Sequence, residues 1–194
     1  MSRWDLGRLA EALTARPARR SEVGALRAAA VLVPLVPRGE GELELLFLVR
    51  PSTLLTHPGQ VAFPGGRLDP EDVDHVAAAL RESEEELGIP RAAPRILGRL
   101  DDLNTHTGFH VTPIVAVLPP DLVLSPSPGE VASTFTVALA ALADPRARRS
   151  VRVRRAGGRE GGREIRLHFW PEHGPVIWGV TGHILANLLD VIGP

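Results

Sequence analysis

The sequence lacks cysteine, lysine and tyrosine altogether. Without cysteine, neither disulfides nor thiolate metal sites can form. All 22 basic residues are therefore arginine, and against 23 acidic residues they leave a formal net charge of −1. This balance gives no reason to expect general affinity for nucleic acids or membranes. No segment approaches the roughly 18 apolar residues of a membrane-spanning helix, and the N-terminus lacks a signal-peptide core, so we expect a cytoplasmic protein.

The composition is that of an ordinary globular protein. Hydrophobic residues make up 44% and charged residues 23% of the chain. A length of 194 residues is enough for one domain with a hydrophobic core. We expect a single domain over residues 1–194, in which residues 1–24 supply an N-terminal helix and a linker.

Hydrophobic periodicity predicts both strands and helices. Two apolar runs, 28–36 and 43–50, are separated by a turn and predict a hairpin. We expect further strands at 61–63, 96–103, 110–117, 133–137 and 166–169, and helices at 4–15, 70–87, 139–143 and 181–192. Strands flanked by two main helices predict an α/β fold with a mixed sheet sandwiched between helices.

Residues 65–89 carry the most informative pattern, a helix with glutamates at its C-terminal end. The acidic turn 69–72, which contains Pro70, predicts the start of this helix. Gly88 followed by Pro90 predicts its end.

Four glutamates occupy the last turns of this helix, namely Glu82, Glu84, Glu85 and Glu86. The helix dipole disfavours each negative charge there by roughly 0.3–1 kcal/mol. Like charges four residues apart cost about 0.2–0.5 kcal/mol more. A bound divalent cation would offset this repulsion, and the alternative is a solvated acidic helix end.

Successive helical residues turn by about 100°, which divides the helix into two faces. Apolar residues fall on one side, which we expect to be buried: Val73, Val76, Leu80 and Leu87. Glu82, Glu85 and Glu86 share an arc on the opposite side, where three carboxylates suit Mg²⁺ or Mn²⁺. Glu84 does not join them and projects toward the edge of the apolar side.

The surroundings of the acidic arc favour a ligand site over a solvated helix end. The upstream run 63–66, Phe-Pro-Gly-Gly, predicts a turn where backbone can approach a ligand closely. Arg81 lies four residues before Glu85 and is expected to pair with it. Ala78 and Ala79, one turn earlier, are short and are expected to leave room for a ligand.

Residues 81–89, RESEEELGI, resemble the second half of the Nudix box, Gly-x5-Glu-x7-Arg-Glu-U-x-Glu-Glu-x-Gly-U, in which U is aliphatic. Ser83 stands where an aliphatic residue is usual. The first half is one residue longer, which places Val73 at the first Glu of the box and makes Asp72 the acidic substitute. The resemblance implies the α/β/α Nudix fold and a pyrophosphatase that depends on Mg²⁺ or Mn²⁺.

Residues 50–66 are similar to the segment that precedes the box in coenzyme A pyrophosphatases of the Nudix superfamily. Six residues match at the right spacing, namely Arg50, Gly59, Phe63, Pro64, Gly65 and Gly66. Leu55 replaces an arginine of that segment. The resemblance implies hydrolysis of coenzyme A or its derivatives to 3′,5′-ADP and 4′-phosphopantetheine or its acyl form.

The resemblance also implies roles for the acidic residues. Glu82 and Glu86 are expected to be the principal metal ligands, and Glu85 to bind metal or to help activate water. Arg81 would fix the rotamer of Glu85. Glu130, which follows a Pro-Gly pair, is a candidate general base, and the alternative is a solvated turn acid.

Four further residues are expected to contact the substrate phosphates. Gly65 and Gly66 would bring backbone close to them, although turn geometry alone would also require glycine. Arg50 would bind a phosphate bidentately or would cap a strand end. Arg67 is a similar candidate.

Alternatives to this interpretation stay open. The substrate could be ADP-ribose, a dinucleoside polyphosphate or an oxidised nucleotide, or the chain could be a silent nucleotide-binding regulator. Residues 146–166 hold nine arginines and predict either a patch for nucleic acid or phosphate, or a hairpin of solvated arginines. The lack of aromatic stacking residues favours the hairpin. We therefore expect a small-molecule partner, and we expect Trp178 in the core.

Overall fold

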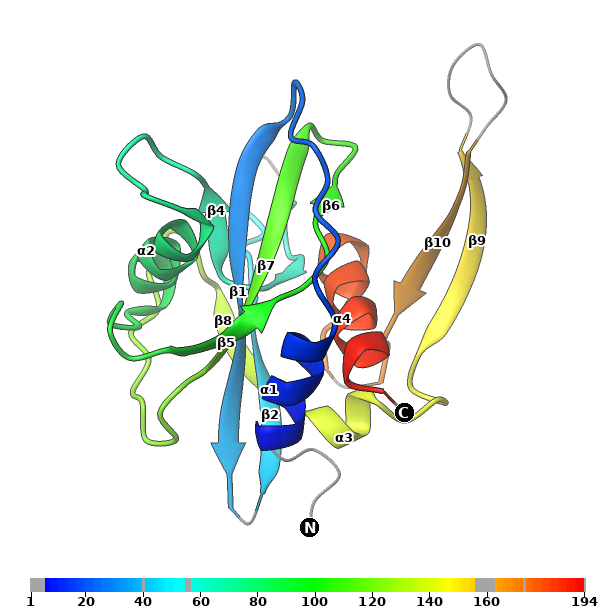
Figure 1. Cartoon of the computed structure of the whole chain (residues 1–194). Coiled ribbons are helices and arrows are strands. Elements are labelled where there is room, and N and C mark those ends of the chain that lie inside the picture. The colour runs from blue at the N-terminus through cyan, green and yellow to red at the C-terminus, as the bar shows by residue number, and fades with distance from the viewer. Residues whose placement is uncertain (1–5, 40, 55–56, 156–162, 173, 194) are drawn as a thin grey trace.

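The computed structural model describes residues 6–39, 41–54, 57–155, 163–172 and 174–193. Within these residues, eight strands form one mixed sheet, and helices cover both of its faces (Figure 1). This confirms the predicted α/β fold with a sheet between helices. The first residues of the predicted helix 4–15, Leu55, and residues 156–162 of the arginine-rich segment lie outside the described part of the chain.

The centre of the sheet is the hairpin of β1 (Arg27–Arg38) and β2 (Glu42–Val49), as predicted. Strand β7 (Phe109–Val117) runs parallel to β1, with Arg27 opposite Phe109. The strand order is β3 (Val61–Ala62), β2, β1, β7 and β5 (Arg95–Arg99). A parallel pair needs a long crossover connection, and the connection between β1 and β7 spans residues 39–108 and includes helix α2 (His75–Leu87) as well as β2.

Shorter strands complete the sheet. On β2 lie β3 (Val61–Ala62) and β8 (Ser133–Ala138), on β1 lies β4 (Gly65–Arg67), and on β7 lie β5 (Arg95–Arg99) and β6 (Leu103–Asn104).

The single strand predicted at 96–103 is wrong, because β5 and β6 are separate. Leu100 donates to the carbonyl of Pro113, but a proline has no N–H to continue the ladder. The N–H of Asp102 donates to Arg19 of the N-terminal linker instead.

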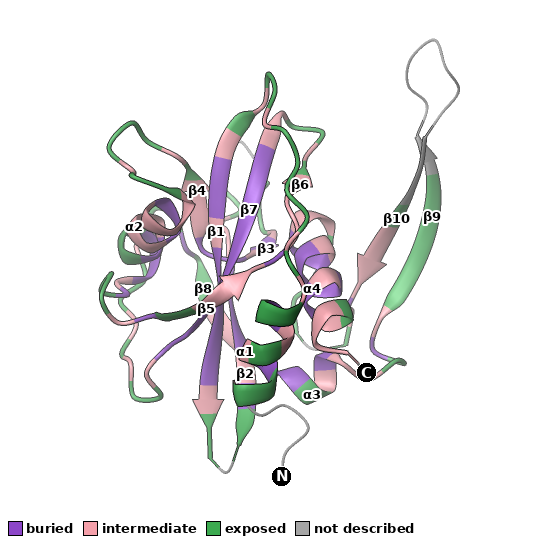
Figure 2. Ribbon diagram, viewed as in Figure 1, coloured by how far each residue is buried: buried purple, intermediate pink, exposed green. Residues whose placement is uncertain are grey.

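Helix α2 covers one face of the sheet, whereas α1 (Leu6–Ala15) and α4 (Gly179–Ile192) cover the other (Figure 1). A short helix, α3 (Leu139–Leu142), follows β8. Buried residues form two hydrophobic clusters, one on each face of the sheet. Figure 2 shows that burial is concentrated along β1, β7 and the inner side of α4. No helix of the described residues is long and apolar enough to cross a membrane.

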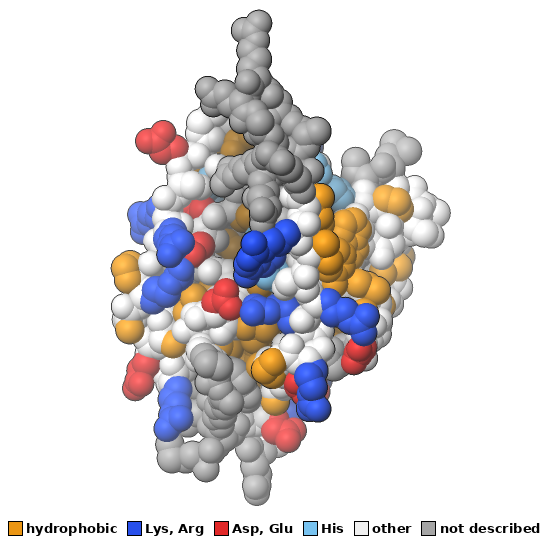
Figure 3. All heavy atoms as spheres, turned by 90° about the vertical axis from the view of Figure 1, so that its right-hand side faces the viewer, with side chains coloured by type: hydrophobic (Ala, Val, Ile, Leu, Met, Phe, Trp, Pro, Cys, Tyr) orange, Lys and Arg blue, Asp and Glu red, His pale blue; other side chains and the backbone are white. Residues whose placement is uncertain are grey.

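The arginine-rich segment contains a second, two-stranded sheet of β9 (Arg149–Arg155) and β10 (Arg163–Phe169). The predicted hairpin is therefore confirmed, with β10 packed against α4. Three arginines near its base pair with carboxylates at 2.9–3.2 Å, namely Arg146, Arg148 and Arg149. On this face of the molecule, basic side chains are interspersed with acidic and apolar ones (Figure 3).

The buried tryptophan of this region is Trp170, whose indole N–H donates to the carbonyl of Leu142 at 3.0 Å. Trp178 is 41% exposed, so its predicted place in the core is wrong. It precedes the first turn of α4 with an extended backbone, and the interior beside α3 is already filled by Trp170.

Candidate active site

Helix α2 begins at His75 rather than at Pro70. Asp74 caps it, because its carboxylate accepts a 2.8 Å hydrogen bond from a backbone N–H of the first turn. The acidic turn is a loop, so Val73 lies outside the helix and is 90% exposed. Its predicted place on the buried face is wrong. Gly88 adopts a φ of 67° and ends the helix as predicted.

Small residues form the face that α2 turns to the sheet. Ala78, Ala79 and Ser83 are fully buried, and the Ser83 hydroxyl donates to the carbonyl of Ala79 at 2.6 Å. The expectation that Ala78 and Ala79 leave room for a ligand is therefore wrong, because they pack against the sheet. Their short side chains let the helix approach the sheet closely, which also brings Glu82 and Glu86 toward it.

Glu86 lies on this buried face and is 4% exposed, so its predicted position opposite the buried side is wrong. Its Oε2 accepts a 2.9 Å hydrogen bond from the N–H of Gly65, and its Oε1 lies 4.0 Å from Nη1 of Arg50. Burial raises the pKa of Glu86 to about 7, and the negative charges of Glu82 and Glu130 contribute to this rise. The hydrogen bond from Gly65 lowers the pKa but does not outweigh burial. The carboxylate is thus buried with little compensation.

Glu82 is partly buried beside β4. A Cβ on Gly66 would come within 2.3 Å of the Glu82 carboxylate, so a larger residue there would displace this side chain from its present position. Burial raises the pKa of Glu82. Arg81 opposes this rise, while the charges of Glu85 and Glu130 add to it. Two neighbouring carboxylates therefore share an environment that disfavours negative charge.

The two glycines before α2 belong to β4, so the predicted turn is wrong for them, although the chain does bend at Pro64 just before them. Gly66 pairs with Ala30 and Gly65 with Val31 of β1. Gly65 adopts a φ of 150°, and a Cβ there would lie 2.3 Å from the carbonyl oxygen of Ala30. Backbone packing therefore requires glycine at position 65, whatever ligand the site binds, whereas glycine at position 66 leaves room for the Glu82 carboxylate.

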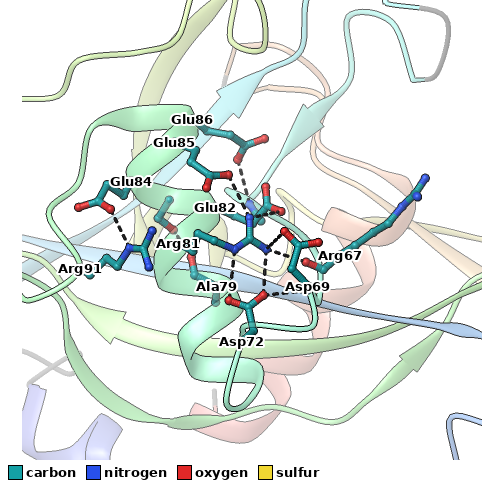
Figure 4. Close-up of polar contacts among 12 residues, drawn as sticks. Arg67, Asp69, Asp72, Ala79, Arg81, Glu82, Glu84, Glu85, Glu86 and Arg91 are labelled. Carbon is teal, nitrogen blue, oxygen red and sulfur yellow. Dashed lines mark hydrogen bonds and ion pairs between the residues drawn. The ribbon is translucent and has the colours of Figure 1, made fainter.

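Arg81 holds the acidic residues together (Figure 4). Its guanidinium donates to both oxygens of Asp72, at 3.2 and 2.9 Å, and to the carbonyl of Arg67 at 2.9 Å. It also donates to Glu82 at 3.1 Å and to Glu85 at 3.0 Å, which confirms the predicted pairing with Glu85. The hydrogen bond from Arg81 lowers the pKa of Asp72. Asp72, the expected acidic substitute of the box, therefore acts as an ion-pair partner that holds Arg81 in position.

The other two glutamates differ in direction. Glu85 is half exposed and keeps one oxygen on Arg81. Glu84 pairs with Arg91 at 2.7 Å and points away from Glu82 and Glu86 (Figure 4). Helical geometry therefore separated Glu84 from the other three correctly.

Three residues that the sequence predicts to contact the substrate or to act as general base differ in how they lie relative to these carboxylates. Arg50 is nearest to Glu86, and its Nε is buried without a hydrogen-bond partner. Glu130 is exposed on the loop before β8, and its charge acts on both Glu82 and Glu86. The side chain of Arg67 is exposed and points away from the glutamates (Figure 4).

The donor set of Glu82, Glu85 and Glu86 fits a hard divalent cation. Carboxylate oxygens are the ligands that Mg²⁺ and Mn²⁺ prefer, and the raised pKa values of Glu82 and Glu86 report a charge that such a cation would neutralise. Within the described residues, no three acidic or histidine side chains converge into a ready-made metal cluster. Arg81 instead engages one oxygen of Glu82 and one of Glu85.

The profile of the NUDIX domain matches residues 26–154, which include α2 and the strands that surround its acidic end. The chain belongs to the Nudix hydrolase family. Its activity is that of a Nudix pyrophosphohydrolase, and Nudix hydrolases generally use divalent metals such as Mg²⁺ or Mn²⁺.

Relatives of this Nudix hydrolase match along most of their length. The uncharacterized Nudix hydrolase NudL of Photorhabdus laumondii is 41% identical over 166 residues, covering 86% of this chain and 85% of that protein. NudL of Escherichia coli O7:K1 is 38% identical over 178 residues, covering 92% and 89%.

Solved structures agree in fold. A MutT/nudix family protein from Enterococcus faecalis gives a TM-score of 0.51 at 12% identity, covering 96% of this chain and 68% of that one. RenU, a Nudix hydrolase from M. smegmatis, gives 0.51 at 22% identity, covering 60% and 73%. At these identities the likeness concerns the fold alone.

Sequence reasoning did not single out Arg27 or Phe109, which the sheet brings next to Arg67. Strand pairing places Arg27 opposite Phe109, and Arg67 opposite Ala29 of the same β1. The three positions belong to three strands far apart in the chain, so no local sequence signal connects them.

Proposed function

We propose that this Nudix hydrolase cleaves the diphosphate of coenzyme A or its derivatives, giving 3′,5′-ADP and 4′-phosphopantetheine or its acyl form. One observation carries the proposal. The segment 50–66, which resembles that of coenzyme A pyrophosphatases, contacts the carboxylate of Glu86 on the Nudix helix from both of its ends. Glu86 accepts from Gly65 and faces Arg50 at 4.0 Å.

Glu82 and Glu86 are the proposed principal ligands of Mg²⁺ or Mn²⁺, with Glu85 as a further ligand. The bound metal would neutralise the diphosphate and lower the pKa of the attacking water. Arg81 has a positioning role in this proposal, because its hydrogen bonds orient Glu82 and Glu85. Glu130 is the proposed general base, since its charge acts on both ligands from an exposed loop.

The proposed substrate contacts lie on the strands beside α2. Arg50 supplies a guanidinium whose Nε has no protein partner, which suits bidentate binding of a phosphate. Gly65 and Gly66 keep that edge free of side chains, and Arg67 continues the same strand. We further propose that residues 1–194 act as one domain, because the linker after α1 is bound to Asp101 and Asp102 between β5 and β6 of the Nudix sheet.

A substrate panel tests this function. Coenzyme A, acetyl-coenzyme A, ADP-ribose and a dinucleoside tetraphosphate are incubated with the protein and Mn²⁺, and the products are separated by chromatography. We expect 3′,5′-ADP from coenzyme A at the highest kcat/KM. Faster turnover of ADP-ribose would overturn the substrate assignment and leave the Nudix activity standing.

Two variants of the same helix sharpen the test. Glu82→Gln removes a proposed metal ligand, whereas Glu84→Gln changes a glutamate that points away from the site. We expect Glu82→Gln to lose most of the activity and Glu84→Gln to keep it. Equal background hydrolysis by Glu82→Gln and the wild type over the whole panel would instead favour the silent regulator.

A further inference from the structure

Two arginines, Arg27 and Arg67, lie against one aromatic ring, that of Phe109, near strand β4. The guanidinium carbon of Arg27 lies 4.1 Å from the centroid of the Phe109 ring, and that of Arg67 lies 5.6 Å from it. The two guanidinium groups are therefore no further apart than the sum of these distances. Cation–π attraction holds each of them on the ring, although their charges repel one another.

The loop before β7 keeps Arg27 in place. Nη2 of Arg27 donates to the carbonyl of Thr107 in this loop at 3.3 Å. The loop is itself closed by hydrogen bonds between Thr105 and Phe109, in which the Phe109 N–H donates to the Thr105 hydroxyl at 2.9 Å and the Thr105 N–H to the Phe109 carbonyl at 2.7 Å. The aromatic platform and one arginine are thus set by the fold before any ligand arrives.

Neither arginine is neutralised by an acidic side chain. Among the described residues, no ion pair joins Arg27 or Arg67 to a carboxylate. By contrast, Arg81 pairs with Asp72, and Arg99 with Asp102. Both Arg27 and Arg67 are exposed, so their positive charge is accessible to a ligand.

This pair lies next to the candidate active site. Arg67 follows Gly66, the residue against which the Glu82 carboxylate packs. Its own carbonyl accepts from Arg81, the residue that orients the glutamates. Successive residues of a strand point to opposite faces. Gly66 therefore faces the Glu82 carboxylate, and the side chain of Arg67 extends from the opposite face of β4, where it reaches Phe109.

We infer that Arg27, Arg67 and Phe109 form a subsite for a phosphomonoester carried by the nucleoside half of the substrate, separate from the diphosphate. This deepens and rests on the proposed function, because the 3′-phosphate of coenzyme A is such a group and one ribose separates it from the diphosphate. Two guanidinium groups bind a phosphate dianion more strongly than a hydroxyl. The subsite therefore selects nucleotides with the 3′-phosphate over those without it.

The test compares coenzyme A with 3′-dephospho-coenzyme A in the full-length enzyme. We expect the wild type to prefer coenzyme A in kcat/KM by at least tenfold. Arg27→Ala should lower kcat/KM for coenzyme A about tenfold and leave that for 3′-dephospho-coenzyme A nearly unchanged. Arg67 is also a proposed contact of the other substrate phosphates, so Arg67→Ala should lower both values, and that for coenzyme A by the larger factor. Arg38→Ala is the matched control, because Arg38 ends the same β1 at its far end and should change neither value.

Calorimetric binding of 3′,5′-ADP and 5′-AMP to the metal-free protein separates this inference from the proposed function. Tighter binding of 3′,5′-ADP that is lost in Arg67→Ala supports the subsite, even if coenzyme A is not hydrolysed and the proposed function fails. If coenzyme A is hydrolysed but the two nucleotides bind equally, or both arginine variants behave like Arg38→Ala, the subsite is overturned and the proposed function stands.

Discussion

Glu86 and Asp102 are two buried carboxylates with opposite environments. Their side chains are 5% and 3% exposed, yet the pKa of Glu86 is raised to about 7 and that of Asp102 is lowered. Burial pushes both values upward. For Asp102 the hydrogen bonds from Ser21, Thr112 and Arg99 outweigh burial. Within the described part of the chain, Glu86 accepts one hydrogen bond, from Gly65, and faces Arg50 at 4.0 Å.

The difference separates a structural acid from a candidate functional one. Asp102 has its hydrogen-bonding capacity satisfied within the protein, and it ties the N-terminal linker to the sheet. Glu86 keeps capacity for a cation at the cost of stability, as expected of a group whose role requires an external partner. Burial alone would not have distinguished them.

Removing Glu86, the candidate functional acid, should have the largest effect. We expect Glu86→Gln to lower kcat with Mg²⁺ about a thousandfold, equivalent to about 4 kcal/mol of transition-state stabilisation. Steady-state kinetics and Mg²⁺ titration measure this loss. Unchanged Mg²⁺ affinity in the variant would remove Glu86 from the ligand set.

Removing the structural acid should act on stability instead. Asp102→Ala leaves Arg99 without its buried partner and should lower the free energy of unfolding by about 3 kcal/mol. Urea denaturation measures it, with the exposed Asp121→Ala as control. The comparison breaks if the folded variant loses kcat as severely as Glu86→Gln does.

The pH dependence of stability should have opposite signs for the two acids. Because the folded pKa of Glu86 is raised, its contribution is complete below about pH 4.5 and is lost as the pH rises through about 7. Metal-free Glu86→Gln should therefore gain stability relative to the wild type from pH 4.5 to 8, by up to about 3 kcal/mol.

The contribution of Asp102 runs the other way. It is complete above the ordinary aspartate value of 3.8 and is lost as the pH falls through its lowered folded pKa. Urea titrations measure the two slopes, with Glu86→Gln followed from pH 4.5 to 8 and Asp102→Ala followed downward from pH 3.8. A flat difference between Glu86→Gln and the wild type would show that Glu86 is compensated in solution.

The smallest effect should come from the exposed glutamate. Glu84 forms a surface ion pair with Arg91, which is worth less than about 0.5 kcal/mol. We expect Glu84→Gln to change the free energy of unfolding, measured by thermal denaturation, by no more than this amount. We also expect its kcat to equal that of the wild type. A large loss of activity would mean that the helix end acts as one charged unit, without the division between Glu84 and the other three glutamates.

Much of this architecture could be predicted from local patterns. Alternation and turns located the β1–β2 hairpin, and Gly88 located the end of α2. The start of α2 could not be located in the same way, because Asp74 and the acidic turn before it are both acceptable N-terminal signals. The buried face of α2 was predicted in part, because Leu87 is buried and Val76 and Leu80 pack against the same cluster. The contribution of Ala78, Ala79 and Ser83 was missed, since alanine and serine carry little hydrophobic signal although they decide how closely a helix packs.

By itself, the sequence determined which residue types are available: four glutamates at a helix end, an arginine before them and a glycine pair upstream. The tertiary structure decided what each one does. Close packing of α2 on β4 buries Glu86 and raises its pKa, Arg91 draws Glu84 outward, and strand pairing gathers Arg27, Arg67 and Phe109. These differences arise from desolvation and from contacts between distant strands, which no spacing along the chain encodes.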